Sequence, residues 1–315
     1  MLKKIVILDA GTFYGHPTFE ESLASLGDLK VYQSTTNQEI GERIKNANIV
    51  LTNKVVLDKV MIQNANKLEL VCVMATGTNN IDLEAAKERN IVVKNAKGYS
   101  TNSVAQTTFA MALQLIMNLK SHHDYVNNGY KSNPFFTHLE PGFSELSGKT
   151  WGIIGLGTIG KKVAEIAEAF GCNLIYHSPS GKNLEANYVH KSLIDLLKES
   201  DFISVHTPLN ENSHNLLNYN NLKFSKSSCI LINVARGGII DESGLKQILD
   251  EDLIFGAASD VYSLEPILPD NPLLTVRNKH KLLLTPHIAW GSKEARQKLM
   301  DMTRQNIVEY LNSGK

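Results

Sequence analysis

The chain has 315 residues, enough for two domains that each bury a hydrophobic core. Lys and Arg together number 32, as do Asp and Glu, so no net charge favours nucleic acid or an acidic membrane surface as a partner. No apolar run approaches the roughly 20 residues of a membrane span. Basic residues near the start precede an apolar patch, but Asp9 ends that patch, which predicts a first strand and not a signal peptide.

The three cysteines, Cys72, Cys172 and Cys229, lie in or beside apolar stretches. Their spacing is not that of metal ligands. We therefore expect buried, reduced thiols, a cytoplasmic location and no metal site.

Residues 1–98 alternate between strand and helix patterns. Strands are predicted at 4–8, from 31 onward, and at 49–52, 68–74 and 91–93, with helices at 18–26, 39–44, 57–65 and 82–89. This alternation indicates a parallel sheet with helices on both faces. The loop at Ala75, Thr76 and Gly77 follows a predicted strand, where its backbone N–H groups can hold an anion such as a carboxylate. An ordinary turn explains the same residues.

A long amphipathic stretch follows at residues 103–119, and Ser100 or Thr101 can cap it. A helix of this length spans about 25 Å and is suited to bridge two domains. Residues 122–143 are polar and aromatic with two prolines, which predicts an irregular loop or crossover near a domain boundary.

The stretch around which the chain is organised begins with the apolar run 151–154 and continues as Gly155-Leu-Gly-Thr-Ile-Gly160. A helical pattern to residue 170 and a strand at 173–176 follow. Strand, glycine loop, helix and strand form the unit that holds a dinucleotide pyrophosphate. Gly155 allows the tight turn, Gly157 lets the backbone approach the phosphates, and Gly160 lets helix and strand pack closely. The helix start at Thr158 and Ile159 offers N–H groups to the anion.

The second half repeats the alternation. Further strands are predicted at 202–205, 230–234, 254–258 and 282–284, with helices at 193–197, 222–224, 243–249 and 293–311. The sequence thus predicts an α/β protein with two doubly wound parallel-sheet domains.

Polar side chains follow three of these strands. Arg236 stands beside two glycines and can bind a carboxylate through two parallel hydrogen bonds. Asp260 and Glu265 follow the next strand, and His287 follows the last. A histidine can exchange a proton with a carbonyl or hydroxyl oxygen, so this set suits hydride transfer to a 2-oxo acid beside a nicotinamide. By residue type alone, His177, His206 and His214 are also candidates for the acid/base.

Together these motifs resemble the D-isomer-specific 2-hydroxyacid dehydrogenases over essentially the whole chain. The resemblance is carried by Ala75-Thr-Gly-Thr-Asn-Asn-Ile-Asp82, Tyr99-Ser-Thr-Asn-Ser-Val-Ala-Gln106, Gly155-Leu-Gly-Thr-Ile-Gly160, His206-Thr-Pro-Leu209, Asn233-Val-Ala-Arg-Gly237, Ala258-Ser-Asp-Val261, Glu265-Pro266 and Pro286-His287. It implies a Rossmann cofactor domain, residues 99–287, inserted in a flavodoxin-like substrate domain made of residues 1–98 plus 288–315. It also implies long helices that act as hinges and a homodimer packed through the cofactor domain.

The resemblance implies His287 as the acid/base, Glu265 as its partner, and Arg236 as the carboxylate anchor together with the amides of Ala75, Thr76 and Gly77. It implies further that the nicotinamide ribose and amide face Asp260, Val234, Ala235 and the Arg236 backbone, with Thr207 and Pro208 nearby. The lining of the side-chain pocket would come from several loops, including residues 12–16 and 52–54 and the crossover near Phe135.

The expected cofactor is NAD(P). NAD enzymes of this design have an acid after the second strand that pairs with the ribose hydroxyls. Here the strand is followed by His177, Ser178, Ser180 and Lys182, with no acid before Glu185. An acid would repel a 2′-phosphate, so its absence, with two serines and a lysine that can bind one, places NADP slightly ahead of NAD. No arginine completes the NADP pattern.

Gln106 and the crossover from Phe135-Phe136 to Glu145-Leu146 favour the hydroxypyruvate reductase or glycerate dehydrogenase branch, and Glu265 argues against the formate dehydrogenase branch, which has Gln there. We expect an enzyme that reduces hydroxypyruvate or glyoxylate. The alternatives are another acid in the same chemistry, such as lactate, phosphoglycerate or a branched 2-oxo acid, and a dinucleotide-sensing binding protein with little turnover. Which 2-hydroxy acid is used and in which direction stay open at this point.

Overall fold

In the computed structural model of the protein, the described residues are 2–13, 17–182 and 187–314. The chain divides into two compact units, one made of Met1–Ser100 and Gly291–Lys315 and the other of Thr101–Trp290. The first boundary was expected after residue 98 and lies after residue 100. The second was expected before residue 288 and lies before residue 291. Each unit is built on its own parallel sheet.

The first unit is a five-stranded sheet in the order β2-β1-β3-β4-β5. Its strands are β1 (Lys4–Ile7), β2 (Asp28–Val31), β3 (Ile49–Thr52), β4 (Leu70–Val73) and β5 (Val92–Asn95), and its helices are α1 (Pro17–Ala24), α2 (Asn37–Ile44), α3 (Lys59–Asn64), α4 (Leu83–Glu88) and α11 (Lys293–Asn312). This strand order is that of the flavodoxin-like doubly wound fold. The apolar runs of β3 and β4 are buried throughout, as expected for strands covered on both faces.

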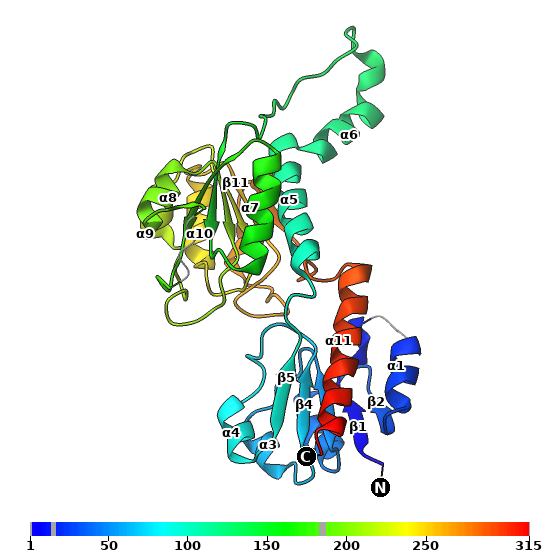
Figure 1. The fold of residues 1–315 in the computed structure, drawn as a ribbon. Helices are drawn as coiled ribbons and strands as arrows, with labels where there is room; N and C mark the ends of the chain where they lie inside the picture. Colours follow the sequence, from blue (N-terminus) through cyan, green and yellow to red (C-terminus); the bar gives the residue numbers. More distant parts are fainter. Residues whose placement is uncertain (1, 14–16, 183–186, 315) are drawn as a thin grey trace. The chain divides into compact units, whose positions relative to one another are not determined.

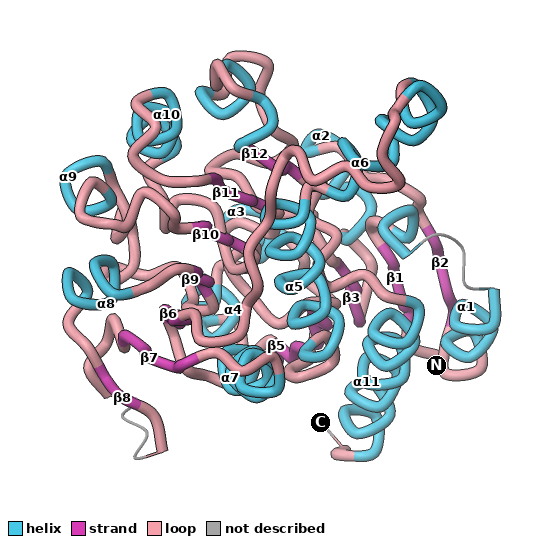
Figure 2. Tube along the Cα trace, turned by 90° about the horizontal axis from the view of Figure 1, so that it is seen from above, coloured by secondary structure: helices cyan, strands magenta, loops and turns pink. Residues whose placement is uncertain are grey.

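The second unit is a seven-stranded parallel sheet in the order β12-β11-β10-β9-β6-β7-β8 (Figure 2). Its strands are β6 (Thr150–Ile154), β7 (Asn173–His177), β8 (Val189–His190), β9 (Phe202–Val205), β10 (Ile230–Asn233), β11 (Gly256–Ser259) and β12 (Leu282–Leu284). Its helices are α5 (Thr101–Met117), α6 (Leu119–Asn128), α7 (Thr158–Ala169), α8 (Leu193–Glu199), α9 (Tyr219–Leu222) and α10 (Glu242–Asp250). Apart from the extra edge strand, the order is that of a Rossmann fold.

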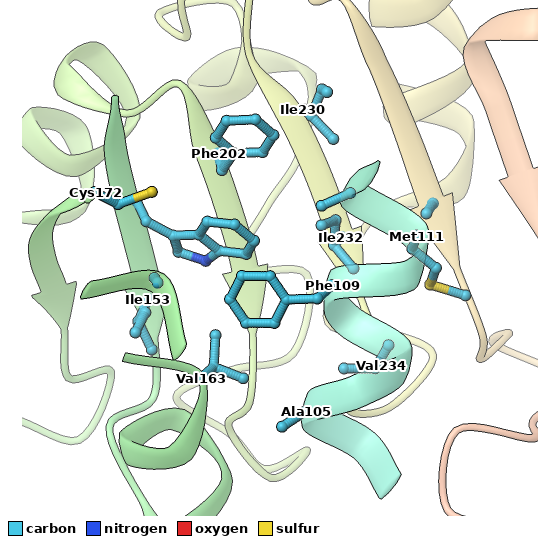
Figure 3. Close-up of a cluster of buried hydrophobic side chains, with 14 of the residues drawn as sticks. Ala105, Phe109, Met111, Ile153, Val163, Cys172, Phe202, Ile230, Ile232 and Val234 are labelled. Atoms are coloured by element: carbon cyan, nitrogen blue, oxygen red, sulfur yellow. The ribbon is translucent and has the colours of Figure 1, made fainter. Parts of the chain in front are cut away.

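Two hydrophobic cores lie on the opposite faces of this second sheet. α5 and α7 cover one face (Figure 2), where the ring of Phe109 in α5 lies 4.6 Å from that of Trp151, tilted by 34°, and stacks on that of Phe170 at 5.5 Å. Figure 3 shows Phe109 among other buried side chains of this core, including Phe202 and Ile232. α8, α9 and α10 cover the other face over Ile203, Leu231 and neighbouring side chains. The predicted fold class, with a cofactor-type domain inserted in the first sheet domain, is confirmed.

Three predicted elements differ from the structure. The helix expected at 222–224 lies earlier, as α9 at Tyr219–Leu222. The second strand ends at Val31 and does not begin there, because β2 is an edge strand whose alternate residues Asp28 and Lys30 are exposed, so it has little apolar content to detect. The segment expected to be an irregular loop begins with helix α6. None of the residues of this helix is buried, and it extends with the following segment away from its sheet, so its mostly polar composition resembles that of a loop (Figure 1).

Candidate active site

The glycine loop joins β6 to α7. Gly155 has a φ of +94°, and a Cβ there would lie 2.7 Å from the backbone nitrogen of Thr207. A Cβ on Gly160 would lie 2.3 Å from the carbonyl oxygen of Gly155, so a side chain would push helix and strand apart. At Gly157 a Cβ would meet nothing within 4 Å, which leaves open space beside the loop.

The N-terminus of α7 fits an anionic group. Gly157 is the N-cap residue and supplies no capping side chain to the first turn. The N–H groups of Thr158, Ile159 and Gly160 have no carbonyl partner inside the helix, since the first turn of any helix lacks one. Together with the helix dipole they suit the pyrophosphate of a dinucleotide, as expected from the motif.

His177 ends β7 and lies near the place where the adenosine ribose of a dinucleotide binds in this fold. Its Nδ1 is 3.1 Å from the carbonyl oxygen of Lys191, and its ring stacks on that of His190 at 5.9 Å. Burial lowers the pKa of His177; the Lys191 carbonyl opposes this shift and His190 adds to it. The neutral imidazole therefore predominates at neutral pH.

The residues after His177 offer hydroxyl and ammonium groups. Ser178 is buried, whereas Ser180 and Lys182 are exposed, and the Lys182 backbone N–H donates to Ser180 Oγ at 3.3 Å. No carboxylate occurs in residues 178–182. Glu185, the next acid in the sequence, lies outside the described residues.

The loop after β10 carries Arg236. Asn233 brackets the turn: its Nδ2 donates to the carbonyl of Arg236 at 2.9 Å and its Oδ1 accepts the Ala235 N–H at 3.1 Å. Gly237 is required here because a Cβ would lie 1.8 Å from the carbonyl oxygen of Tyr262. Arg236 is partly buried and donates one guanidinium hydrogen bond to the Ala235 carbonyl.

His287 and Glu265 form the one histidine–carboxylate pair among the candidates. His287 Nδ1 lies 2.5 Å from Glu265 Oε2, and the two side chains are 21% and 30% exposed. Glu265 Oε1 accepts the backbone N–H of Tyr262 at 3.1 Å, so the carboxylate itself is held. With the carboxylate on Nδ1, the ring presents Nε2 as the atom for proton exchange.

Asp260 holds the loop that bears His287. Its side chain is fully buried; Oδ1 accepts from Thr285 Oγ1 at 2.6 Å and from the Ile288 N–H at 2.8 Å, and Oδ2 accepts from the Ala289 N–H at 2.8 Å. His287 between these anchors has a φ of +54°, which is uncommon for a residue with a side chain. The geometry thus shows Asp260 anchoring both sides of the loop that carries His287, and the cofactor contact expected from the resemblance stays a prediction.

The other residues expected near the nicotinamide lie at neighbouring strand ends of the same unit. Thr207 follows β9 and is buried, and Pro208 after it is exposed. Val234 is buried and Ala235 is half-buried in the loop after β10. The carboxyl ends of β9, β10, β11 and β12 therefore bring these residues to the same edge as His287.

The other candidate histidines have different surroundings. His206 follows β9, and both its ring nitrogens are buried with no hydrogen-bond partner among the described residues. Burial lowers the pKa of His206 to about 3, so it stays neutral. His214 is exposed, and neither it nor His177 has a carboxylate partner in the described part of the chain. Of the four candidate histidines, His287 is the one for which the described part of the chain shows a carboxylate partner.

The predicted carboxylate loop lies in the first unit, after β4. Ala75 and Gly77 are partly exposed and Thr76 is exposed. Thr12 and Lys54, both expected to line the side-chain pocket, border one pocket of about 470 Å³ at this edge, a size suited to a small ligand. Residues 14–16 of the same prediction lie outside the described residues.

Phe135, the other residue expected at that pocket, belongs to the second unit. It follows α6 and lines a surface hollow beside Tyr125 and His138, whose rings stack at 3.6 Å.

Sequence reasoning did not assign roles to Tyr262 and Thr285. The Tyr262 hydroxyl donates to the carbonyl of Thr285 at 2.8 Å, and Thr285 Oγ1 donates to Asp260. These contacts join segments more than twenty residues apart, so no local pattern could reveal them. Within the described residues, no cluster of His, Cys, Asp and Glu could hold a metal, and no helix has the length and apolarity to cross a membrane.

Comparison with known proteins assigns this architecture. Residues 109–289 match the family model described as "D-isomer specific 2-hydroxyacid dehydrogenase, NAD binding domain". The chain is 36% identical to a hydroxypyruvate reductase of Blautia hydrogenotrophica, over 99% of this chain and 98% of that protein. It is 33% identical to a glycerate dehydrogenase of Methylorubrum extorquens, over 99% and 97% of the two chains. A solved acyclic imino acid reductase in complex with NADPH and D-Arg superposes with a TM-score of 0.88 at 31% identity, covering 98% and 97% of the chains.

Proposed function

Because the chain belongs to the D-isomer-specific 2-hydroxyacid dehydrogenases, which are NAD(P)-dependent oxidoreductases of 2-oxo acids, we propose that it reduces hydroxypyruvate or glyoxylate to the matching hydroxy acid. Two relatives that match over nearly their whole length are a hydroxypyruvate reductase and a glycerate dehydrogenase. The observation that carries the catalytic part of the proposal is the His287–Glu265 pair, with Nδ1 and Oε2 2.5 Å apart.

In the proposed reaction His287 donates a proton from Nε2 to the carbonyl oxygen of the 2-oxo acid, and takes it back when the hydroxy acid is oxidised. Glu265 on Nδ1 keeps the ring in the required tautomer and stabilises the charged imidazolium. A bound nicotinamide supplies or accepts the hydride at the substrate carbon. His287 thus handles the proton at the oxygen of the same bond.

Arg236 is proposed to bind the substrate carboxylate through its guanidinium. The backbone N–H groups of Ala75, Thr76 and Gly77 are proposed to donate to the same carboxylate. Arg236 directly follows Ala235 in a turn that the Asn233 side chain fixes by two hydrogen bonds, one to the Ala235 N–H and one to the Arg236 carbonyl. This supports a fixed placement of the Arg236 guanidinium.

For the cofactor we propose NADPH ahead of NADH. The support is the end of β7, where His177 is followed by Ser178, Ser180 and Lys182 and by no acid within the described loop. A carboxylate at this place would repel a 2′-phosphate, whereas hydroxyls and an ammonium can bind one. Gly155, Gly157, Thr158, Ile159 and Gly160 are proposed to hold the pyrophosphate.

We further propose that the enzyme works as a homodimer in the cytoplasm. The segment after α6 carries Phe135, Phe136, Leu139 and Phe143, each more than half exposed, and such apolar patches commonly mark protein–protein contacts. The three cysteines are unpaired and buried, which suits a reducing compartment. A Phe136→Asp variant that stays dimeric by light scattering would place the interface elsewhere.

The test of function is the loss of nicotinamide absorbance on mixing the purified protein with NADH or NADPH and a panel of hydroxypyruvate, glyoxylate, pyruvate and a longer 2-oxo acid. We expect fastest turnover with NADPH and one of the two short polar acids. Each acid is also assayed with ammonium, because a similar fold serves an imino acid reductase. Tight cofactor binding with no turnover on any member would favour a dinucleotide-sensing protein.

A further inference from the structure

The loop after β4 presents three consecutive amides without partners. The N–H groups of Ala75, Thr76 and Gly77 form no hydrogen bond with any other described residue, and the three residues are not buried. Unpaired neighbouring N–H groups at the carboxyl end of a parallel strand form an anion-binding arrangement. Their usefulness depends on all three pointing to the same place.

The carbonyls that precede these amides are each held from the other side. The Met74 carbonyl accepts from Asn53 Nδ2 at 2.5 Å, and the Thr76 carbonyl accepts from Asn95 Nδ2 at 2.6 Å. Between them, the Ala75 carbonyl accepts the N–H of Ala96 at 3.1 Å. In a planar trans peptide the C=O and the following N–H point in opposite directions. Holding each of these carbonyls therefore fixes the peptide unit that carries the next N–H group.

Asn53 is itself mounted on a fixed backbone. The Asp9 carboxylate is 5% exposed and accepts the N–H groups of Asn53 at 3.0 Å, Lys54 at 2.6 Å and Val55 at 3.2 Å. One carboxylate thus sets the path of three residues after β3. A carboxylate that accepts several backbone N–H groups forms strong, charge-assisted hydrogen bonds.

Asn53 is buried with one of its two side-chain polar atoms unpaired in the described part of the chain. Its side chain is 5% exposed, and its Oδ1 is buried without a hydrogen-bond partner among the described residues. An unsatisfied buried acceptor lowers stability and offsets part of what the bond to the Met74 carbonyl contributes. The bond that Asn53 does make is the one to the Met74 carbonyl, immediately before the first free amide.

We propose that Asn53 and Asn95 are positioning residues that aim the amides of Ala75, Thr76 and Gly77 at the substrate carboxylate, and that Asp9 fixes the backbone that carries Asn53. This inference rests on the proposed function, in which those amides bind a 2-oxo acid. Asn53 and Asn95 touch neither the reacting atoms nor the cofactor. They act by orienting the peptide units between them.

The test compares Asn53→Ala and Asn95→Ala with Asn48→Ala. Asn48 directly precedes β3, at the opposite edge of the same sheet, where its side chain accepts the Lys4 N–H at 2.9 Å and donates to Glu69 at 2.9 Å. Removing it disturbs the sheet without touching the amide loop. Melting temperatures of all three variants report the structural cost.

We expect Asn53→Ala and Asn95→Ala to raise KM for the 2-oxo acid roughly 10- to 100-fold, the scale of a small misplacement of binding groups, with KM for NADPH unchanged and kcat reduced much less. Asn48→Ala should leave KM for the acid within a factor of about two. A rise of the same size in all three variants, or unchanged KM in the first two, would overturn the positioning role.

Binding of oxamate, a non-reacting analogue of a 2-oxo acid, is measured in parallel by calorimetry with NADH or NADPH present. If the wild-type protein binds oxamate but reduces no acid on the panel, the proposed function fails while oxamate affinity still tests the two asparagines. Weaker binding in Asn53→Ala and Asn95→Ala but not in Asn48→Ala supports the inference. Equal affinity in all four proteins, or no binding to the wild type, contradicts it.

Discussion

Replacing Asp260 by asparagine removes one acceptor from a buried carboxylate that holds both sides of the His287 loop. If the remaining oxygen keeps Thr285 and Ile288, the new NH₂ group faces the Ala289 N–H, now 2.8 Å from Oδ2. Ala289 is 2% exposed, so its N–H is left without water or partner. A buried donor without a partner lowers the free energy of unfolding by about 1–3 kcal/mol. In a unit of this size, each kcal/mol lowers the melting temperature by roughly 2–4 °C.

The same change should also lower kcat, because it loosens the loop that carries His287. His287 has a left-handed backbone conformation between the two anchored ends of its loop, so loosening one end displaces the imidazole. We expect kcat for reduction of the 2-oxo acid to fall roughly 10- to 100-fold, with little change in KM for the nicotinamide cofactor. The assay is steady-state absorbance with each substrate varied in turn.

Asp201→Asn is the matched control. Asp201 lies at the opposite edge of the same sheet, where it accepts the Thr150 N–H at 2.9 Å and pairs with Lys226 at 3.1 Å. It should cost stability but leave kcat near the wild-type value. The reasoning is refuted if both variants lose kcat equally, or if Asp260→Asn raises KM for the cofactor at unchanged kcat, because Asp260 would then contact the cofactor directly.

Three further predictions concern charge and burial. Lys182→Ala should raise KM for NADPH about fivefold, the effect of one exposed charge, and leave KM for NADH unchanged. The control variant Lys162→Ala should leave KM for both cofactors unchanged. An equal rise for both cofactors in Lys182→Ala would exclude a 2′-phosphate site at this residue. His206 has a pKa of about 3 when folded and 6.5 when unfolded, so its contribution to the free energy of unfolding is fully present above pH 6.5 and is lost as pH falls toward 3. In urea titrations at several pH values, His206→Asn should therefore show a weaker fall in the free energy of unfolding between pH 6.5 and 3. Parallel curves for the variant and the wild type would refute this prediction. Burial raises the pKa of the Cys72 and Cys229 thiols to about 12, so a thiol reagent at pH 8 should label them only after denaturation, and rapid labelling of the folded protein would contradict their burial.

The fold could be predicted from the sequence where strands are buried on both faces. β3 and β9 begin and end where their apolar runs do, because a strand covered by helices on both sides contains few polar residues. β2 and α6 were misjudged because both lie at an exposed margin. β2 is defined by its pairing with β1, and none of the residues of α6 is buried, so neither element contains the run of buried apolar residues that marks the central strands.

The candidate site was predictable only in part. Polar residues directly after buried strands pointed to Arg236, Glu265 and His287, since the ends of parallel strands share one edge. The groups that orient them could not be found in this way. The bonds from Asp260 to the Ala289 N–H and from Asn53 to the Met74 carbonyl could not be predicted, because these partners lie 29 and 21 residues away and the pairing depends on the folded path of the chain.

The most direct test of the account is the rate of NADPH oxidation by hydroxypyruvate in the wild type and in His287→Ala, with NADPH affinity measured alongside by fluorescence. His287 pairs with Glu265 and its side chain is 21% exposed, so the variant should fold and bind NADPH normally. We predict a loss of turnover of about 10²–10⁴, the usual contribution of a general acid, with NADPH affinity unchanged. Wild-type turnover in His287→Ala would contradict the assignment of the proton to this residue and with it the proposed mechanism.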